Sequence, residues 1–167
     1  MNDKLKVKLL HPNAKPPARA GGLEAGYDLY ALEYVTIAPF EVKKVRTGVA
    51  VEIPWKGWYG KIFDRSSIGS KGLAVHAGVI DYSYRGEIQI VMQNLSVFQY
   101  LGAFANRIIS KVTGREEPLS VEHYEIKPGD KISQIVFMPH AGWEVEISNE
   151  LSDTERGEKG FGSTSNR

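Results

Sequence analysis

The sequence contains no cysteine, which excludes disulfide bonds and thiolate metal sites and favours a reducing compartment. An excess of one charge is also lacking, since 21 Lys and Arg residues against 20 Asp and Glu leave a formal net charge of +1. No hydrophobic run approaches the length of a membrane span, and residues 1–12 lack the apolar stretch of a signal peptide. We therefore expect a protein of the cytoplasm or nucleus that binds neither a nucleic acid polymer nor a membrane.

What remains is the composition of one ordinary globular domain. The chain has 167 residues, of which 42% are hydrophobic and 25% charged, and a chain of this length can bury a sizeable core. Because the charges nearly balance, an anionic ligand would have to be held by individual arginines and backbone amides. The four histidines, His11, His76, His123 and His140, have no companion ligand at helical spacing, so a histidine-ligated metal site is not expected.

Short stretches of alternating residues recur along the chain and predict β-strands. The alternating sets are Leu5, Val7 and Leu9; Thr47, Val49, Val51 and Ile53; Ile88, Ile90 and Met92; Ile132, Gln134, Val136 and Met138; and Val145 and Ile147. Proline and glycine separate these stretches, as expected for turns between short strands. This pattern predicts an all-β fold, either a sandwich or a jelly-roll-like β-barrel.

Residues 98–125 interrupt this rhythm. Four apolar residues there lie close to the spacing of a helical stripe, namely Phe104, Ile108, Ile109 and Val112. Gly114 and Pro118 follow and are typical of helix ends. We predict a short helix within an insertion of about residues 96–127, whose apolar stripe either packs on its own subunit or docks a partner protein.

Two segments place polar side chains where a strand alone would not need them. In AGYDLYA, Asp28 lies between large apolar residues and needs a partner, such as an arginine, because an unpaired buried carboxylate is costly. In DRSSIGSKG, Arg65, Ser66 and Ser67 offer guanidinium, hydroxyl and amide donors that can bind phosphate oxygens. A structural ion pair and an ordinary turn are the alternative interpretations of these two segments.

The stretch HAGVIDYSYRGEI, residues 76–88, has the pattern of a β-hairpin with Asp81 at its mouth. An aspartate in such a place commonly stabilises a turn. It can also act as a general base that removes a proton from water. In PGDKISQIVF, Gln134 lies among apolar strand residues, where its amide can hydrogen-bond the backbone or reach a ligand oxygen.

Residues 156–167, RGEKGFGSTSNR, lack any hydrophobic period that would hold them against a core. They contain three glycines, adjacent hydroxyl residues and one aromatic residue, Phe161. A disordered terminus is the simplest interpretation. The alternative is a mobile segment that closes over a ligand.

The order of these segments is more specific than any one of them. AGYDLYA, RSSIGSKG, GVIDYSYRGEI, GDKISQIV and RGEKGFGSTS, in this order from about residue 25 to 165, resemble the five motifs of the trimeric deoxyuridine triphosphatase (dUTPase) family. The resemblance implies a β jelly roll assembled as a homotrimer, with each active site shared among three subunits. It also implies a barrel domain over residues 1–152 and a flexible C-terminal arm, residues 153–167, that acts as a lid.

The resemblance further implies hydrolysis of dUTP to dUMP and pyrophosphate by attack of water on the α-phosphorus. This reaction keeps uracil out of DNA and supplies dUMP for thymidylate synthesis. Asp81 would orient and deprotonate the water, and Mg²⁺ would bind through the triphosphate and water rather than through a protein cage. Asp28 would orient an arginine or a metal-bound water.

The substrate contacts that the resemblance implies fall into three groups. Tyr84 would lie under the deoxyribose and leave no space for a 2′-hydroxyl. The backbone around Gly78, Val79 and Gln89 would read the uracil edge, and Phe161 would stack on the base. The phosphate contacts would come from Arg65, Ser66, Ser67, Gln134, Arg156, Gly162, Ser163 and Thr164.

Three other functions stay open at the level of the sequence. The related enzyme dCTP deaminase needs a glutamate in the strand after the GVIDYSYRGEI motif, where Val91 stands here. An inactive paralogue would have no need to keep residues such as Asp81 and Tyr84. Some phage members of the family use an insertion at this place to bind repressor proteins. A protein-binding regulator that acts through residues 98–125, with or without catalysis, is therefore the second hypothesis.

Overall fold

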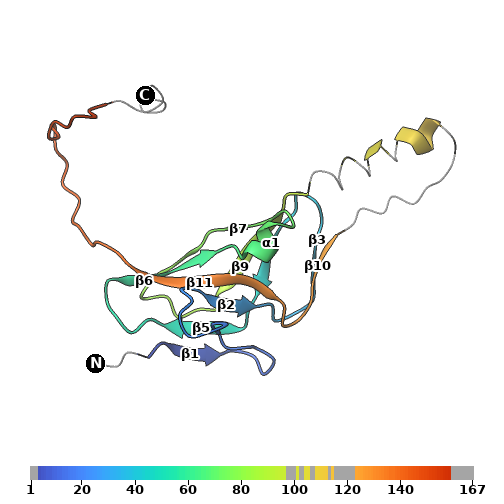
Figure 1. Ribbon diagram of the computed structural model, residues 1–167, viewed down its shortest axis with the longest axis horizontal. Coiled ribbons are helices and arrows are strands. Elements are labelled where there is room, and N and C mark those ends of the chain that lie inside the picture. The colour runs from blue at the N-terminus through green and yellow to red at the C-terminus, as the bar shows by residue number, and fades with distance from the viewer. Residues whose placement is uncertain are drawn as a thin grey trace.

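The computed structural model describes residues 4–96, 101, 104–105, 108–112, 114 and 123–158. The body is built from short strands, so the all-β prediction is confirmed (Figure 1). The elements are β1 (Lys6–Leu9), β2 (Tyr27–Tyr30), β3 (Val35–Ile37), β4 (Val42–Arg46), β5 (Val49–Glu52), β6 (Trp58–Phe63), α1 (Ser66–Gly69), β7 (Leu73–His76), β8 (Val79–Ile80), β9 (Gln89–Asn94), β10 (Tyr124–Ile126) and β11 (Lys131–Pro139). Among the described residues, no helix has the length and apolar character needed to cross a membrane.

The strands of the described chain pair antiparallel and form four small sheets. β1 pairs with β5, and β10 pairs with β3. A third sheet has the strand order β2-β11-β6-β8, and a fourth has the order β4-β9-β7. Because β11 lies between β2 and β6, it brings the segments around Asp28, Arg65 and Gln134 side by side.

One apolar core lies between these sheets. Residues from separate sheets contribute side chains that are 0% exposed, namely Ile37, Val45, Val49, Ile88, Met92, Ile132 and Ile135. Burial of each such side chain stabilises the fold by roughly 1.5–3 kcal/mol relative to leaving it exposed. The predicted alternation is clear in β9, where buried and more exposed residues alternate, whereas β1, predicted from Leu5, Val7 and Leu9, is exposed along its whole length.

β11 departs from the simple alternation predicted for it. Its pairing with β2 shifts register between Lys131 and Ser133, as in a β-bulge. Ile132 and Ser133 are consequently both buried, and Ile135 rather than Gln134 points into the core. The prediction that Gln134 shares the face of Ile132 is therefore wrong, and the bulge leaves Gln134 on a partly exposed face.

The predicted hairpin through Asp81 is also wrong. β8 pairs with β6, whereas β9 pairs with β4 and β7. Residues 81–88, called here the Asp81 segment, thus cross from one sheet to another. Two short strands separated by turn residues give the same sequence pattern whether they pair with each other or with other strands. The pattern therefore does not specify the strand partners.

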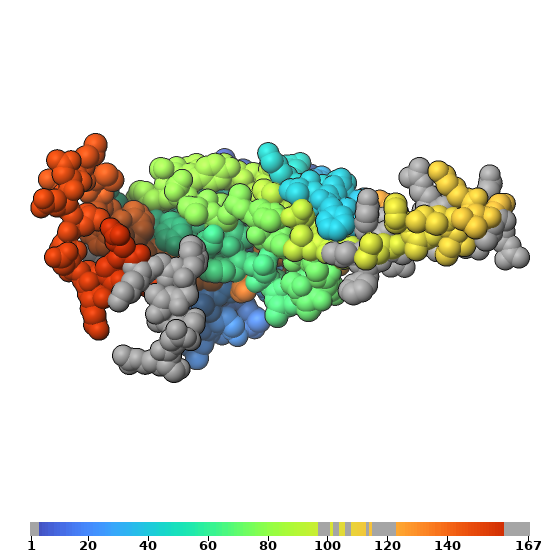
Figure 2. Space-filling model, turned by 90° about the horizontal axis from the view of Figure 1, so that it is seen from above, coloured from blue at the N-terminus to red at the C-terminus, as the bar shows by residue number. Residues whose placement is uncertain are grey.

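The insertion contains a helix, as predicted. Its backbone is helical at residues 101, 104–105 and 108–112. Gly114 ends it with a φ of +66°, and its N–H donates to the carbonyl of Ser110 at 3.0 Å. The apolar stripe is 50–80% exposed at Phe104, Ile108, Ile109 and Val112. Figures 1 and 2 show the described part of the insertion, in yellow, projecting beyond the strands. The described residues of the stripe are therefore at least half exposed to solvent.

The C-terminal segment, residues 141–158, leaves the body after β11 and is exposed throughout (Figures 1 and 2, orange to red). The strand predicted from the alternation of Val145 and Ile147 is wrong for the single chain, since no described strand pairs with it. Trp143, Val145 and Ile147 are 88%, 95% and 97% exposed. Alternation alone does not make a strand, because the backbone also needs a partner.

Candidate active site

Asp28 on β2 lies at the centre of a charged cluster. Its Oδ1 is 2.8 Å from Arg65 Nε, and its Oδ2 is 2.7 Å from Lys131 Nζ. The Asp28 side chain is only 13% exposed, so the two cations offset the cost of burying its charge. The arginine partner expected for Asp28 is therefore Arg65, which stands immediately before α1.

Gln134 joins this cluster from β11. Its Nε2 donates to the carbonyl of Asp64 at 3.0 Å, and it lies opposite Asp28 in the β2–β11 register. Gly26 is needed beside it, because a Cβ on that residue would overlap Gln134 Oε1. Backbone and side chain together thus hold the amide at the edge of a cavity.

This cavity, called here the Arg65 pocket, has a volume of about 180 Å³. Its lining residues are Ala20, Glu24, Gly26, Asp28, Arg65, Ser66 and Gln134. A guanidinium, a hydroxyl and an amide therefore face one small space. Such groups match the oxygens of a phosphate chain, and arginine is especially suited to them because its donors form a planar fork.

Asp81 lies in a different cavity of about 370 Å³, called here the Asp81 pocket, with Tyr59, Val79, Tyr82 and His140. The backbone turns directly after Asp81, where the N–H of Tyr84 donates to the Asp81 carbonyl at 3.0 Å. No hydrogen bond or ion pair to the Asp81 carboxylate is found within the described part of the chain. Its oxygens are thus available to accept a proton or a hydrogen bond from a ligand or water.

The predicted site residues therefore separate into groups. Asp28, Arg65, Ser66 and Gln134 meet in the Arg65 pocket, whereas Val79 and Asp81 line the other cavity. Ser67 lines a separate cavity that Arg65 also borders, and its Oγ accepts a hydrogen bond from Arg65 Nη1 at 3.3 Å. Tyr84 lies on the Asp81 segment, and Gln89 begins β9. The carbonyl of Gly78 accepts a hydrogen bond from the N–H of Ile62 at 2.7 Å. Arg156 lies on the exposed C-terminal segment. Phe161, Gly162, Ser163 and Thr164 lie outside the described residues.

Several residues at these pockets were not predicted. Lys131 is the second cation on Asp28, and Glu24 adds a carboxylate to the Arg65 pocket. Tyr59 and His140 line the Asp81 pocket, with ring centroids 6.3 Å apart. The position of Lys131 directly after the PGD turn of the fourth motif is a signal from which it could have been predicted. Tyr59 and His140 had no such signal in the sequence, because the β6–β8 pairing brings Tyr59 beside Asp81 and the β6–β11 pairing brings His140 beside Tyr59.

The comparisons with known proteins agree with the order of the motifs. The dUTPase family model matches residues 13–100 and 119–165. The chain belongs to the dUTPase family. The deoxyuridine 5′-triphosphate nucleotidohydrolase of Candida albicans is 38% identical over 163 residues, which cover 96% of this chain and 87% of that protein. The corresponding protein of Nautilia profundicola is also 38% identical, over 96% of this chain and 98% of its own length.

Solved dUTPase structures share the fold. The Staphylococcus bacteriophage 80alpha dUTPase with dUPNHPP matches this chain with a TM-score of 0.78 at 31% identity. The match covers 98% of this chain and 99% of that one. The fold predicted from the motifs, that of the dUTPase family, is therefore confirmed.

Proposed function

We propose that this dUTPase, which hydrolyses dUTP to dUMP and pyrophosphate, does so by attack of water on the α-phosphorus. In this mechanism the Arg65 pocket holds phosphate oxygens and Asp81 acts on the water. The main support is the meeting of Asp28, Arg65 and Gln134, from three distant motifs, in one pocket rich in donors. The reaction removes dUTP before DNA synthesis and supplies dUMP for thymidylate synthesis. Because the chain has no cysteine, we place it in a reducing compartment, the cytoplasm or the nucleus.

Asp81 has the role of general base. It would accept a proton from the attacking water and hold that water in line with the α-phosphorus. The support is its position in a cavity and the absence of a polar partner for its carboxylate among the described residues. The carboxylate of Asp28, in contrast, already binds Arg65 and Lys131 through its two oxygens.

The Arg65 pocket has the role of stabilising charge on the phosphates. Arg65, Ser66 and Gln134 are positioned before substrate arrives, and preorganised donors lower the energy of the pentacoordinate centre. Ser67 would add a hydroxyl. The C-terminal arm would add phosphate contacts from Arg156, Gly162, Ser163 and Thr164. Phe161 would cover the uracil.

Nucleoside recognition belongs to the Asp81 pocket and the Asp81 segment. The backbone of Gly78 and Val79, with Gln89, would pair with the uracil edge, and Tyr84 would support the deoxyribose. Gly78 is suited to this close approach, since a Cβ there would lie 2.8 Å from the carbonyl oxygen of Ile62. Hydrogen-bond mismatch then rejects cytosine, and contact with the sugar face rejects a ribonucleotide.

Mg²⁺ is expected to be held by the oxygens of the triphosphate and by water. Both oxygens of Asp28 are already occupied by Arg65 and Lys131, which fits a carboxylate that orients cations and water around the phosphates. When bound, Mg²⁺ neutralises phosphate charge and polarises the phosphoryl group. The dUTPase of Staphylococcus aureus phage phi11 is known to coordinate a structural Mg(II) ion.

The separation of the two pockets supports a homotrimer with shared sites. Neither pocket alone contains donors for both phosphate and nucleoside, so a site between chains would unite an Arg65 pocket with the Asp81 pocket of another subunit. The exposed alternation of Trp143, Val145 and Ile147 supports the same assembly. Residues 141–152 would find their partner on a neighbouring subunit, which would make residues 1–152 the barrel domain and residues 153–167 the arm.

Pyrophosphate release in the presence of Mg²⁺ tests the function directly. Wild type and Asp81→Asn would be assayed with dUTP, dCTP, dTTP and UTP. We expect release from dUTP alone and its loss in Asp81→Asn, with unchanged circular dichroism showing that the variant is folded. If folded wild type does not hydrolyse dUTP, the proposed mechanism fails.

A second function, docking of a protein on the insertion, is supported by the exposure of Phe104, Ile108 and Val112. An exposed apolar stripe on a projecting helix is typical of a surface that binds another protein. The dUTPase of phage phi11 also carries a species-specific insert. Pull-down of partners with the full chain and with a chain lacking residues 98–125 tests this role. A partner that binds both equally well excludes the insertion as the docking site.

A further inference from the structure

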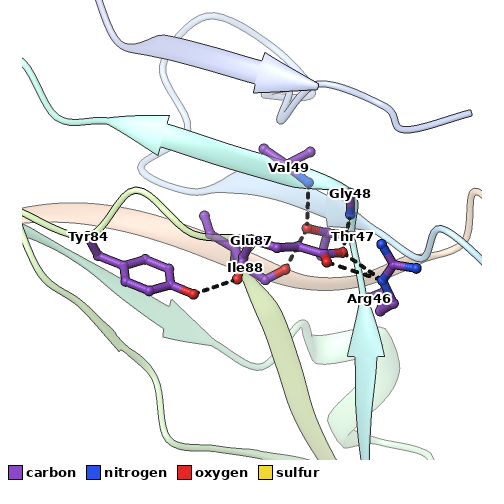
Figure 3. Close-up of polar contacts among 7 residues, drawn as sticks. All are labelled: Arg46, Thr47, Gly48, Val49, Tyr84, Glu87 and Ile88. Carbon is purple, nitrogen blue, oxygen red and sulfur yellow. Dashed lines mark hydrogen bonds and ion pairs between the residues drawn. The ribbon is translucent and has the colours of Figure 1, made fainter. Parts of the chain in front are cut away.

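Glu87, at the end of the Asp81 segment, reaches across to the corner between β4 and β5, residues 46–49 (Figure 3). Its two carboxylate oxygens lie 3.2 and 3.1 Å from Arg46 Nε. The N–H of Gly48 donates to Glu87 Oε1 at 2.8 Å. Since the Glu87 side chain is only 14% exposed, water screens these contacts less than it screens a surface ion pair.

The neighbouring backbone is tied to the same corner. The N–H of Ile88 donates to the Val49 carbonyl at 2.8 Å, and Thr47 Oγ1 donates to the Ile88 carbonyl at 2.6 Å (Figure 3). Ile88 is 0% exposed and Thr47 is 1% exposed. The corner is itself fixed, because Gly48 has a φ of +69° and a Cβ there would lie 2.8 Å from Ala14 Cβ. Residues 87 and 88 are therefore anchored through both side chain and backbone.

Tyr84 rests on this anchored backbone. Its Oη donates to the carbonyl of Glu87 at 2.9 Å (Figure 3). Its ring lies directly on Gly86, where a Cβ would be 2.5 Å from Oη and 2.6 Å from Cζ. Because Tyr84 is 44% exposed, packing alone holds the ring weakly, and the place of the Glu87 carbonyl sets where the ring lies.

We propose that Glu87 is a positioning residue for sugar selection. This inference rests on the proposed function, in which Tyr84 lies under the deoxyribose. Arg46 and the Gly48 N–H fix the Glu87 carboxylate, the anchored backbone fixes the Glu87 carbonyl, and that carbonyl fixes Tyr84. A small shift of the ring away from the sugar opens space for a 2′-hydroxyl, so selection against UTP depends on a carboxylate that itself touches no substrate.

The test is the ratio of kcat/KM for dUTP to kcat/KM for UTP in wild type and Glu87→Ala. We expect this ratio to fall by about tenfold, the effect of misplacing one hydrogen-bonded contact. The ratio of dUTP to dCTP should change less, because Gly78 and Val79 are held by β6 and only Gln89, opposite Arg46 in the β4–β9 register, lies at the disturbed corner. Glu87→Gln keeps an acceptor for the Gly48 N–H and should show a smaller shift in the same direction.

Glu41→Ala is the matched control. The Ala38 N–H donates to Glu41 Oε2 at 2.8 Å, Lys43 Nζ lies 3.2 Å from Oε1, and these contacts hold the pKa of Glu41 below its usual range. This carboxylate thus bridges a backbone N–H and a cation as Glu87 does, but at the β3–β4 turn. We expect Glu41→Ala to lower the melting temperature without changing the dUTP to UTP ratio.

Equal losses of kcat/KM for dUTP and UTP in Glu87→Ala would show a purely structural role and overturn the inference. Tyr84→Phe provides a second check, since it removes the donor to the Glu87 carbonyl. It should lower the same ratio, and adding Glu87→Ala to it should lower the ratio little further, whereas fully additive losses would contradict the proposed connection. A folded wild type that does not prefer dUTP to UTP would refute the proposed function, and this inference with it, before any Glu87 variant is measured.

Discussion

The Arg65 pocket and the Asp81 pocket are built in opposite ways. In the first, Asp28, Arg65, Lys131 and Gln134 are cross-linked by ion pairs and hydrogen bonds within one chain. In the second, the Asp81 carboxylate has no polar partner among the described residues, and only its backbone is held in a turn. The groups proposed to bind phosphate are thus preorganised, whereas the carboxylate proposed as the general base is left unengaged among the described residues.

This difference fits the roles proposed for the two sets of residues. A donor that stabilises phosphate charge works best when it does not have to reorganise during the reaction. A general base works best when its lone pairs are not already satisfied. The difference therefore predicts that changes in the two pockets will affect different steps.

The largest effect is expected from Asp81→Asn. The amide keeps the shape of the side chain but cannot accept a proton, so kcat should fall by roughly 10²–10⁴-fold while KM changes little. Titration with a non-hydrolysable dUTP analogue checks that binding is retained. A large loss of affinity in this variant would mean that Asp81 serves binding as Arg65 does, and the contrast between the pockets would disappear.

Arg65→Ala should weaken binding of the triphosphate. Loss of a charge-assisted contact to phosphate is worth roughly 1.5–3 kcal/mol, so KM should rise about 10- to 100-fold. Lys44→Ala is the matched control, since it removes an exposed cation on β4 outside both pockets. Equal rises of KM in both variants would show a loss of general positive charge rather than of a specific contact.

Co-expression of the Arg65→Ala and Asp81→Asn chains, assayed at a dUTP concentration where each variant alone has little activity, asks whether the pockets of different subunits cooperate. If one site takes Arg65 from one subunit and Asp81 from another, each trimer that contains both Arg65→Ala and Asp81→Asn chains restores about a third of its sites. Pyrophosphate release by doubly tagged trimers measures this recovery. Background activity in purified mixed trimers would instead place both pockets in sites of a single chain.

Gly26→Ala should have the smallest effect. The added methyl overlaps Gln134 Oε1 and must displace the amide, so KM for dUTP should rise about threefold, the lower range for overpacking. Gly22→Ala is the control, because nothing lies within 4 Å of its added methyl. Similar kinetics for both variants would mean that the place of Gln134 in the Arg65 pocket is not important for binding.

The sequence predicted the types of residue in the site better than their surroundings. It identified Asp28 as a carboxylate in need of a partner, and Arg65 is that partner, because the cost of an unpaired charge is a property of the single residue. It did not identify Lys131 on Asp28, nor Tyr59 and His140 beside Asp81. Those neighbours depend on which strands pair, which a local pattern does not contain.

The two alternating stretches at the end of the chain show the same limit. Residues 131–139 form β11 between two strands, whereas residues 143–148, with an equally regular alternation, remain exposed and unpaired in the described chain. An alternating sequence indicates that one face of a strand can be buried, but it does not determine whether another strand is present to pair with it.

The sequence by itself determined the all-β class, the dUTPase family and the chemistry of the groups in the site, since these depend on residue type, spacing and order. Only the tertiary structure decided that a bulge in β11 turns Gln134 out of the core, that Asp28 carries two cations, and that Asp81 lies in a pocket apart from Arg65. It also decided that Glu87 anchors Tyr84 to the β4–β5 corner. The physical reason is that register, strand partners and ion pairs arise from contacts between residues far apart in the chain, whereas periodicity and propensity are local.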